Sequence, residues 1–447
     1  MSSRPWHDLP EHSDNSRLLV DIMDANRHRQ RVGIFSVCSA SRFVMEACML
    51  QARRDDSVVL LESTSNQVNQ FGGYTGMTPA GFRDFANSVA ADMNFPQSRV
   101  VLGGDHLGPH VWRSEPAEAA MAKARQLVRD CVLAGYTKIH LDASMRLAGD
   151  PADQPLDDAV VAERAADLCQ EAEQAWASLP PGSQPPVYVV GSEVPIPGGE
   201  LAGQSAPAVS RTSDVTRTLS LTRAEFERRG LHAAWDRVIA VVVQPGVEFG
   251  DATVFEYDRA AARDLSRLIE RDWRLVYEAH STDYQTFDAL RMLVEDHFAI
   301  LKVGPGLTFA MREALFALEA IEREWLAGPA DAKRSRLRDV MQAAMIDSPE
   351  HWKSYYRGTE DELRFARDFS FSDRSRYYWP RADVRASVTR LLRNLSERAI
   401  PLALVSQYMP DQYVAVRTGM LPNDPIELIR AKILEVADLY ASACGMR

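Results

Sequence analysis

The sequence predicts a (β/α)8 barrel followed by a helical extension, and three observations support this prediction. Short apolar segments rich in β-branched residues recur eight times, and each precedes a longer stretch with helical periodicity. Their spacing of roughly 25 to 50 residues suits parallel strands, which need long crossover connections. Eight such units favour a closed barrel over an open doubly wound sheet. Polar residues also cluster at the ends of these segments, where barrel enzymes place their active sites.

The predicted strands occupy the first three quarters of the chain. They are residues 32–40, 58–65, 99–106, 138–144, 187–194, 238–246, 274–280 and 299–306. A helix over 311–326 follows the last strand, so we assign 1–325 to the barrel and 326–447 to the extension. Amphipathic patterns predict extension helices over 333–345, 384–395 and 425–441. Two aromatic segments there, HWKSYYRG and RSRYYWP, are predicted to pack on the barrel, with a second subunit as the alternative.

Composition excludes several classes of partner. The 447-residue chain has a formal net charge of -11, which argues against nucleic-acid and anionic-membrane binding because both need a basic surface. One phosphate needs only a local pocket and stays compatible with this charge. Five cysteines without C-x-x-C spacing indicate reduced thiols, and no apolar stretch approaches the ~18 residues of a membrane span. We therefore expect a cytoplasmic protein, and we expect it to form a homo-oligomer.

The strongest local motif is GGDHLGP, residues 103–109, at the end of the third predicted strand. An adjacent Asp105 and His106 at a barrel mouth can divide the chemistry between them. The carboxylate would move a proton, and the imidazole would bind a metal ion. An aspartate that caps the next helix beside a packed histidine is the alternative.

Three further strands supply candidate metal ligands. Glu278 and His280 lie two residues apart, so strand geometry places both on one face. Glu193 ends the fifth predicted strand, and Gln244 ends the sixth. We predict that His106, His280 and Glu193 hold a divalent ion, with Gln244 as a weaker oxygen ligand and Glu193 as a second catalytic carboxylate. Packed core histidines and a surface or helix-capping glutamate are the alternatives.

Polar residues on other strand ends are candidates for substrate binding. His140 and Asp142 share one face of the fourth predicted strand, and we favour hydroxyl binding or support of a metal ligand over direct ligation. The amide-rich loop after the second strand suggests polyol binding, although an ordered structural loop is nearly as good an explanation. For a phosphate, the end of the eighth strand precedes a helix whose free amides favour an anion, unless the lysine merely closes the barrel. The candidates are Ser65, Asn66, Gln67, His140, Asp142, Glu278, Ser281, Lys302 and Gly304.

Two nucleotide-binding motifs are missing from the sequence. It has no G-x-x-x-x-G-K-[ST] segment, and no G-x-G-x-x-G follows the first predicted strand. An ATP-dependent kinase and a dinucleotide-dependent enzyme therefore have little support.

Several long motifs resemble the tagatose-bisphosphate aldolase accessory-subunit family of GatZ/KbaZ type. They are SNQVNQFGGYTGMTP, GGDHLGP, KIHLDASM, VVQPGVEF, VYEAHSTDYQ, ILKVGP and SDRSRYYWP. The resemblance implies a barrel related to class II, zinc-dependent aldolases. It maps their acid/base and metal ligand onto Asp105 and His106, and a later metal histidine onto His280. Where the class II pattern has another histidine, this chain has Gln244, which puts the affinity for the metal in question.

Members of this family are described as non-catalytic partners of an aldolase subunit and as 4-epimerases of tagatose 6-phosphate and fructose 6-phosphate. We favour a metal-dependent 4-epimerase, because a purely structural partner would not need these residues at one mouth. Zinc is the first choice of metal, with manganese or cobalt as alternatives. In a 2-ketose the C4 hydrogen is too far from the carbonyl to be acidic, so retro-aldol cleavage and re-addition is the expected route.

Overall fold

The fold is built on eight parallel strands that close into a barrel, as the sequence predicts. The computed structural model describes residues 6, 14–151, 156–191, 207–272, 274–326 and 333–447. Around the barrel the strand order is β1-β10-β9-β6-β5-β4-β3-β2. The barrel strands are β1 (Ile34–Val37), β2 (Val59–Thr64), β3 (Val100–Leu107), β4 (Lys138–Leu141), β5 (Val187–Val190), β6 (Val238–Val242), β9 (Val276–Ala279) and β10 (Phe298–Val303). Six of them lie inside their predicted segments, and β3 and β10 each extend one residue beyond theirs.

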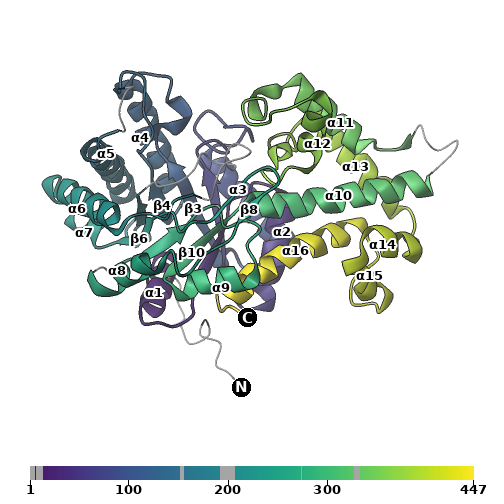
Figure 1. The fold of residues 1–447 in the computed structure, drawn as a ribbon, viewed down its shortest axis with the longest axis horizontal. Helices are drawn as coiled ribbons and strands as arrows, with labels where there is room; N and C mark the ends of the chain where they lie inside the picture. The colour runs from purple at the N-terminus through teal and green to yellow at the C-terminus, as the bar shows by residue number, and fades with distance from the viewer. Residues whose placement is uncertain (1–5, 7–13, 152–155, 192–206, 273, 327–332) are drawn as a thin grey trace.

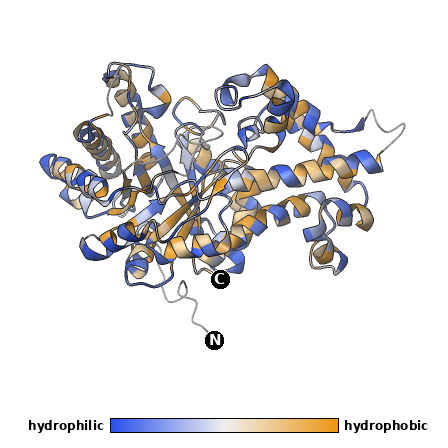
Figure 2. Cartoon of the chain, viewed as in Figure 1, coloured by the Kyte–Doolittle hydropathy of each residue, from blue (hydrophilic) through white to orange (hydrophobic). Residues whose placement is uncertain are grey.

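Helices surround these strands and bury their outward faces. They are α1 (Asn15–Arg27), α2 (Arg42–Arg54), α3 (Pro79–Asp92), α4 (Ala117–Leu133), α5 (Asp158–Ala177), α6 (Thr212–Arg228), α7 (His232–Trp235), α8 (Arg263–Asp272), α9 (Phe287–Glu295) and α10 (Pro305–Trp325). Figure 2 shows hydrophobic residues on the strands and on the inner sides of the helices. Strands buried on both faces need continuous apolar runs, which explains segments such as VIAVV in β6.

Local sequence determines where several of these helices begin. The Thr78 side chain accepts a hydrogen bond from the amide of Gly81, and Pro79 is the first helical residue of α3. The first helix, α1, was not among the predicted elements. Its Asn26 donates hydrogen bonds to the carbonyls of Val32 and Val294, just before β1 and β10. This helix therefore covers the N-terminal end of the barrel.

The C-terminal residues form six helices and two short 3-10 helices, Pro349–His351 and Arg374–Tyr377, in the described part of the extension. These helices are α11 (Leu337–Asp347), α12 (Glu360–Phe369), α13 (Ala382–Ser396), α14 (Leu402–Tyr408), α15 (Pro410–Arg417) and α16 (Pro425–Ala443). In Figure 1, α10 and α16 lie side by side and run from the barrel toward α13, α14 and α15. The last helix, α16, also packs on α2 and α9 of the barrel. The chain thus ends against its own first strand, where the Gly33 amide donates to the carbonyl of Cys444.

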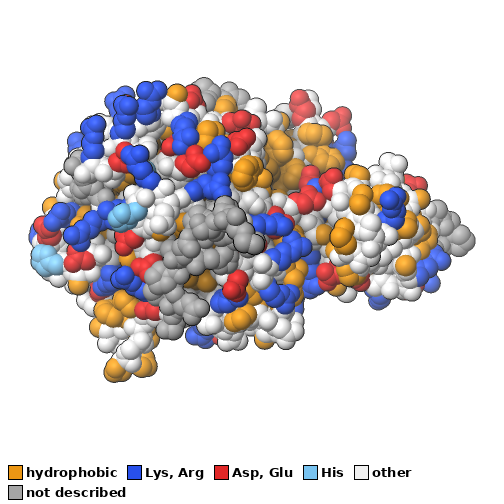
Figure 3. Space-filling model, turned by 90° about the horizontal axis from the view of Figure 1, so that it is seen from below, with side chains coloured by type: hydrophobic (Ala, Val, Ile, Leu, Met, Phe, Trp, Pro, Cys, Tyr) orange, Lys and Arg blue, Asp and Glu red, His pale blue; other side chains and the backbone are white. Residues whose placement is uncertain are grey.

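Charged residues cover much of the outer surface. On the face shown in Figure 3, Lys and Arg side chains lie interspersed with Asp and Glu side chains. Among the helices of the described ranges, none is long and apolar enough to cross a membrane.

Candidate active site

Three strand ends bring one aspartate and three histidines together at the mouth of the barrel. Asp105 and His106 belong to β3, His140 to β4, and His280 follows β9. One ligand atom from each of the four lies within 4.8 Å of those of the others, and all four side chains are buried. The three imidazole centroids are 4.9 to 5.4 Å apart. We call these four residues the mouth cluster.

A local irregularity in β3 lets two consecutive residues face the mouth. In a regular strand, neighbouring side chains point to opposite faces. Here the pairing of β3 with β4 shifts between Gly104 and Leu107, and His106 adopts a left-handed backbone with φ of 48°. Gly108 follows because a Cβ there would lie 1.6 Å from the carbonyl oxygen of Asp142. The GGDHLGP motif therefore encodes the geometry that aims Asp105 and His106 together.

Carboxylates orient two of the imidazoles. The Nδ1 atom of His106 lies 2.7 Å from Asp142, and the Nε2 atom of His280 lies 2.8 Å from Glu278. Each carboxylate accepts the proton of one ring nitrogen, so Nε2 of His106 and Nδ1 of His280 keep their lone pairs. A carboxylate behind a histidine is the arrangement that metal-binding imidazoles usually show. Oxygen and nitrogen donors in this number suit a divalent ion such as zinc.

His140 completes the cluster from below. Its Nδ1 accepts a hydrogen bond of 3.2 Å from the backbone N–H of His106, which leaves Nε2 to donate to the Gly191 carbonyl at 3.0 Å. The same Nδ1 lies 3.1 Å from an oxygen of Asp105. The Lys302 ammonium lies 2.8 Å from the same Asp105 oxygen and offsets the repulsion between the two acceptors. The mouth cluster therefore has the donor set for a bound cation.

The residues of the mouth cluster differ in how the protein shifts their pKa values. Burial opposes ionisation of Asp105, but His106 and Lys302 outweigh it and hold the pKa of this carboxyl well below its usual range. Burial also lowers the pKa of His280, to about 3, although Glu278 and Asp105 favour its protonation. In His106 the nearby carboxylates Asp105 and Asp142 win against burial and raise the pKa. At neutral pH an ionised aspartate thus faces a neutral histidine.

Below the mouth cluster, four charged residues fill the barrel interior. The Lys138 ammonium lies 2.6 Å from Glu62 and 2.7 Å from Glu278, and all three side chains are fully buried. Lys302 pairs with Glu62 and lies 2.8 Å from Asp105. Gly103 stands opposite Glu62 in the β2–β3 register, and a Cβ there would lie 2.8 Å from the Glu62 side chain. We call Glu62, Lys138, Glu278 and Lys302 the interior ion-pair layer.

A cavity opens above the mouth cluster. Many predicted site residues line it: Asn66, Gln67, Asp105, His106, His280, Ser281, Lys302 and Gly304. Gln67 is held by the loop itself, because its side chain accepts from the Thr64 amide and donates to the Cys38 carbonyl. Ser65 is fully buried and is not among the described residues of the lining.

Other predicted residues have partners within the protein. Asp142 holds His106, while Glu278 holds His280 and Lys138. Gln244 is buried after β6, and its side-chain oxygen accepts a hydrogen bond from the Gly246 amide at 2.8 Å. It is not one of the cavity-lining residues in the described ranges. Glu193 lies outside the described residues.

The predicted phosphate corner is occupied by a side chain. One oxygen of Asp283 accepts hydrogen bonds from the amides of Gly304, at 2.9 Å, and Gly306, at 2.7 Å. Burial raises the pKa of Asp283 to about 6, although both amides and Arg376 favour the ionised form. The first amides of α10 therefore bind a carboxyl group of the protein.

Sequence reasoning missed several residues that line the cavity. They are Cys38, Thr64, Tyr74, Phe249, Asp283, Val303, Pro305, Arg376 and Tyr377. Arg376 and Tyr377 come from the RSRYYWP segment of the extension, which packs on the barrel. The ring centroids of Tyr377 and Tyr74 are 4.7 Å apart. The unusual aromatic content of this segment was the signal, but its place over the mouth depends on the tertiary fold.

Comparison with known proteins agrees with this architecture. A profile of the family described as D-tagatose-1,6-bisphosphate aldolase subunit GatZ/KbaZ-like matches residues 19–445. A crystal structure of a probable tagatose 6 phosphate kinase from Sinorhizobium meliloti 1021 is 45% identical, with a TM-score of 0.84, and the match covers 92% of this chain and 100% of that one.

Two aldolase structures are more distant. A fructose-bisphosphate aldolase from Campylobacter jejuni has 14% identity and a TM-score of 0.45, with 86% of this chain and 93% of that chain covered. The YdjI aldolase from Escherichia coli K12 has 10% identity and a TM-score of 0.39, with 81% and 95% covered. The family profile, by contrast, spans nearly the whole sequence, and the chain belongs to the D-tagatose-1,6-bisphosphate aldolase subunit GatZ/KbaZ-like family.

Proposed function

We propose that this protein is a metal-dependent 4-epimerase that interconverts D-tagatose 6-phosphate and D-fructose 6-phosphate. The observation that carries the proposal is the mouth cluster, in which Asp105 faces two imidazoles whose other nitrogens are held by carboxylates. A subunit that only stabilised a partner would have no use for such a set. Membership in an aldolase-subunit family is in keeping with carbon–carbon bond chemistry on a ketose phosphate.

A divalent ion fits the mouth cluster, with zinc as the first choice. His106 would bind it through Nε2 and His280 through Nδ1. Glu193 stays a proposed ligand or second catalytic carboxylate, and Gln244 a proposed weaker one. Such an ion would stabilise the negative charge that develops on the ketose oxygens.

Asp105 is the proposed acid/base. It is ionised at neutral pH and lines the cavity, so it can accept the proton of the C4 hydroxyl. The C3–C4 bond then breaks, its electrons move toward the C2 carbonyl as an enediolate, and C4 becomes an aldehyde. After the aldehyde rotates, C3 attacks its other face and Asp105 returns the proton to the new hydroxyl. Lys302, 2.8 Å from Asp105, keeps the carboxylate in position.

The family description also supports a second candidate, a non-catalytic subunit that stabilises an aldolase. The two functions differ in what the isolated protein does. Purified protein, loaded with zinc, should convert tagatose 6-phosphate alone into fructose 6-phosphate, as followed by NMR. If it stays inactive until an aldolase subunit is added, and then only bisphosphate is cleaved, the second candidate is correct.

Isotope labelling tests the proposed route. Retro-aldol chemistry keeps the C4 hydrogen on carbon, so substrate carrying deuterium at C4 should give product that retains the label. Loss of the label to water would show proton abstraction at C4 and would exclude the proposed route. Substrate deuterated at C6 serves as the control, because the C6 hydrogens are not adjacent to a carbonyl carbon in either route and do not exchange.

A further inference from the structure

Two cationic side chains line the cavity among the residues that the structure describes. They are Lys302 from β10 and Arg376 from the extension. The charge of Lys302 is balanced inside the protein, since its ammonium pairs with Glu62 and Asp105. A phosphate approaching Lys302 would have to compete with two carboxylates that are already in contact with it. Arg376 is therefore the better candidate for binding an anion in this cavity.

The guanidinium of Arg376 is bound by neutral groups. Nη1 donates to the backbone carbonyls of Ser372 and Asp373, and Nη2 donates to the Tyr377 hydroxyl at 3.1 Å. No carboxylate lies within ion-pair distance of Arg376 in the described ranges. Arginine keeps its positive charge at any physiological pH. The cavity thus contains a cation whose charge is not balanced by a directly contacting acid.

The segment that carries Arg376 is fastened to the barrel at several points. The Tyr284 hydroxyl, in the loop after β9, donates to the Phe371 carbonyl at 2.6 Å. The Phe371 amide donates to the carbonyl of Asp251, in the turn between β7 (Glu248–Phe249) and β8 (Val254–Phe255), an antiparallel pair that follows β6. Asp373 accepts hydrogen bonds from the hydroxyls of Thr308, on α10, and Ser375. These contacts fix the backbone on both sides of Arg376, so its position over the mouth is set before any ligand arrives.

We propose that Arg376 binds the phosphate of the substrate, and that the extension is thereby part of the substrate site. This inference rests on the proposed function, because it takes the substrate to be a sugar phosphate. It moves the phosphate away from the amides of Gly304 and Gly306, which already bind Asp283. Arginine matches phosphate well, since its planar fork can donate two parallel hydrogen bonds. Sugars without phosphate would lose this contact.

Binding measurements test the inference without any need for turnover. Calorimetric titration with fructose 6-phosphate, inorganic phosphate and fructose would be compared for wild-type protein, Arg376→Met and Arg376→Lys. Loss of a charged hydrogen bond should weaken fructose 6-phosphate binding of Arg376→Met by roughly 10- to 100-fold. Arg376→Lys should recover part of the affinity, because it restores the charge without the fork. Fructose affinity should stay within about twofold in all three proteins, which shows that the site is still folded.

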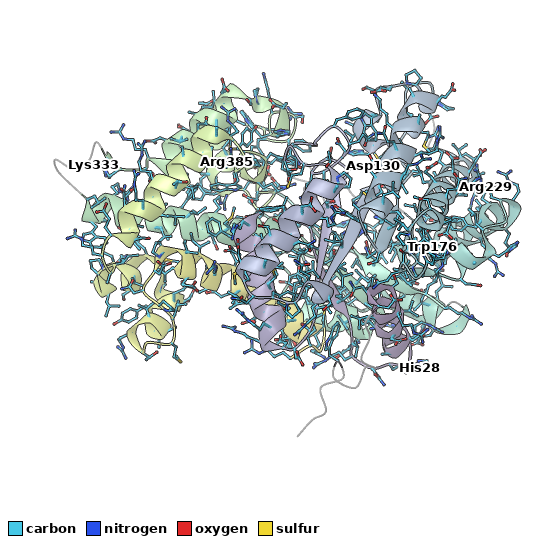
Figure 4. All side chains as sticks on the ribbon, turned by 180° about the vertical axis from the view of Figure 1, so that it is seen from behind. His28, Asp130, Trp176, Arg229, Lys333 and Arg385 are labelled. Atoms are coloured by element: carbon cyan, nitrogen blue, oxygen red, sulfur yellow. The ribbon has the colours of Figure 1, made fainter. Side chains whose placement is uncertain are left out.

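Arg385→Gln is the matched control, since it also removes one arginine from the extension. Arg385, labelled in Figure 4, is exposed on α13. The control should bind fructose 6-phosphate as the wild type does. Equal affinity of Arg376→Met and wild type for fructose 6-phosphate would overturn the inference. So would a wild type that prefers fructose 6-phosphate no more than fructose. A protein that binds the phosphate through Arg376 but does not epimerise would refute only the proposed function.

Discussion

The mouth cluster and the interior ion-pair layer are both built from ionisable side chains of the same barrel, yet they differ in how many of the polar atoms have a partner within the protein. In the interior layer Lys138 lies between Glu62 and Glu278 at 2.6 and 2.7 Å, so acids and bases balance within the protein. In the mouth cluster, Nε2 of His106 lies 3.8 Å from Asp105, beyond hydrogen-bonding distance. Nδ1 of His280 has no partner in the part of the chain that the structure describes.

This difference distinguishes structure from function. Buried charges that are fully paired hold strands in register, and removing one leaves the others without compensation. Buried polar atoms that have no partner within the protein cost free energy, unless a bound ligand supplies the missing partner. We therefore assign stability to the lower layer and chemistry to the upper one. The following experiments test whether the interior ion-pair layer contributes to stability and the mouth cluster to chemistry.

The largest effect is expected for Asp105→Asn. Asparagine keeps the shape of the side chain but removes the base, so turnover should fall by roughly 10²- to 10⁴-fold. Stability should change little, because Lys302 keeps its contact with Glu62. Asp130→Asn on α4, labelled in Figure 4, is the control and should leave turnover unchanged. Steady-state kinetics and thermal unfolding measure both properties, and a variant with full activity would remove Asp105 from the mechanism.

Next is Lys138→Met, which leaves Glu62 and Glu278 without their shared cation. The free energy of unfolding should fall by about 3–5 kcal/mol, the cost of breaking a buried ion pair. Urea denaturation measures this. Lys333→Met, on an exposed residue of the extension labelled in Figure 4, should change it by less than about 0.5 kcal/mol. If both variants were equally stable, the interior layer would have no structural role.

A smaller effect on stability but a clear effect on metal content is expected for His280→Ala. The variant loses a proposed ligand. Its zinc affinity should therefore fall by more than the roughly 10- to 100-fold that is typical when a residue hydrogen-bonded to a metal ligand is lost. Metal analysis after dialysis against a competing chelator measures the loss. His28→Ala is the control, because His28, labelled in Figure 4, is exposed at the end of α1, and its ring lies 2.6 Å from the Asp24 carbonyl of the same helix. Unchanged zinc affinity in His280→Ala would exclude His280 as a ligand.

The smallest effects are expected for residues that orient a proposed metal ligand without binding the metal themselves. Asp142→Asn keeps the shape next to His106 but weakens the hydrogen bond that orients the ring, and zinc affinity should fall by roughly 10- to 100-fold. Ser144→Ala removes only a 2.8 Å hydrogen bond to Asp142, so the loss should be about two- to tenfold. The same chelator competition ranks both. A larger loss of zinc affinity in Ser144→Ala than in Asp142→Asn would contradict the proposal that Ser144 acts on His106 only through Asp142.

Sequence reasoning predicted much of this fold and part of the site. All eight barrel strands were predicted, because strand periodicity and crossover spacing are local properties of the chain. Of the extension, 384–395 and 425–441 were predicted and are parts of α13 and α16, and 333–345 overlaps α11, whereas α12, α14 and α15 were not expected. Asp105, His106 and His280 were predicted to meet, since the ends of parallel strands converge at one edge. For His140 we favoured substrate binding or support, and its ring lies within the mouth cluster.

By itself, then, the sequence determined the barrel and the set of polar residues at its mouth, because both follow from patterns between neighbours in the chain. Tertiary structure alone decided which charges are already paired, as for Lys302 with Glu62 and Asp105. It also decided that Asp283 occupies the first amides of α10 and that Arg376 reaches the cavity from the extension. These contacts join residues far apart in sequence, and their partners depend on how helices and loops pack, which no local periodicity encodes.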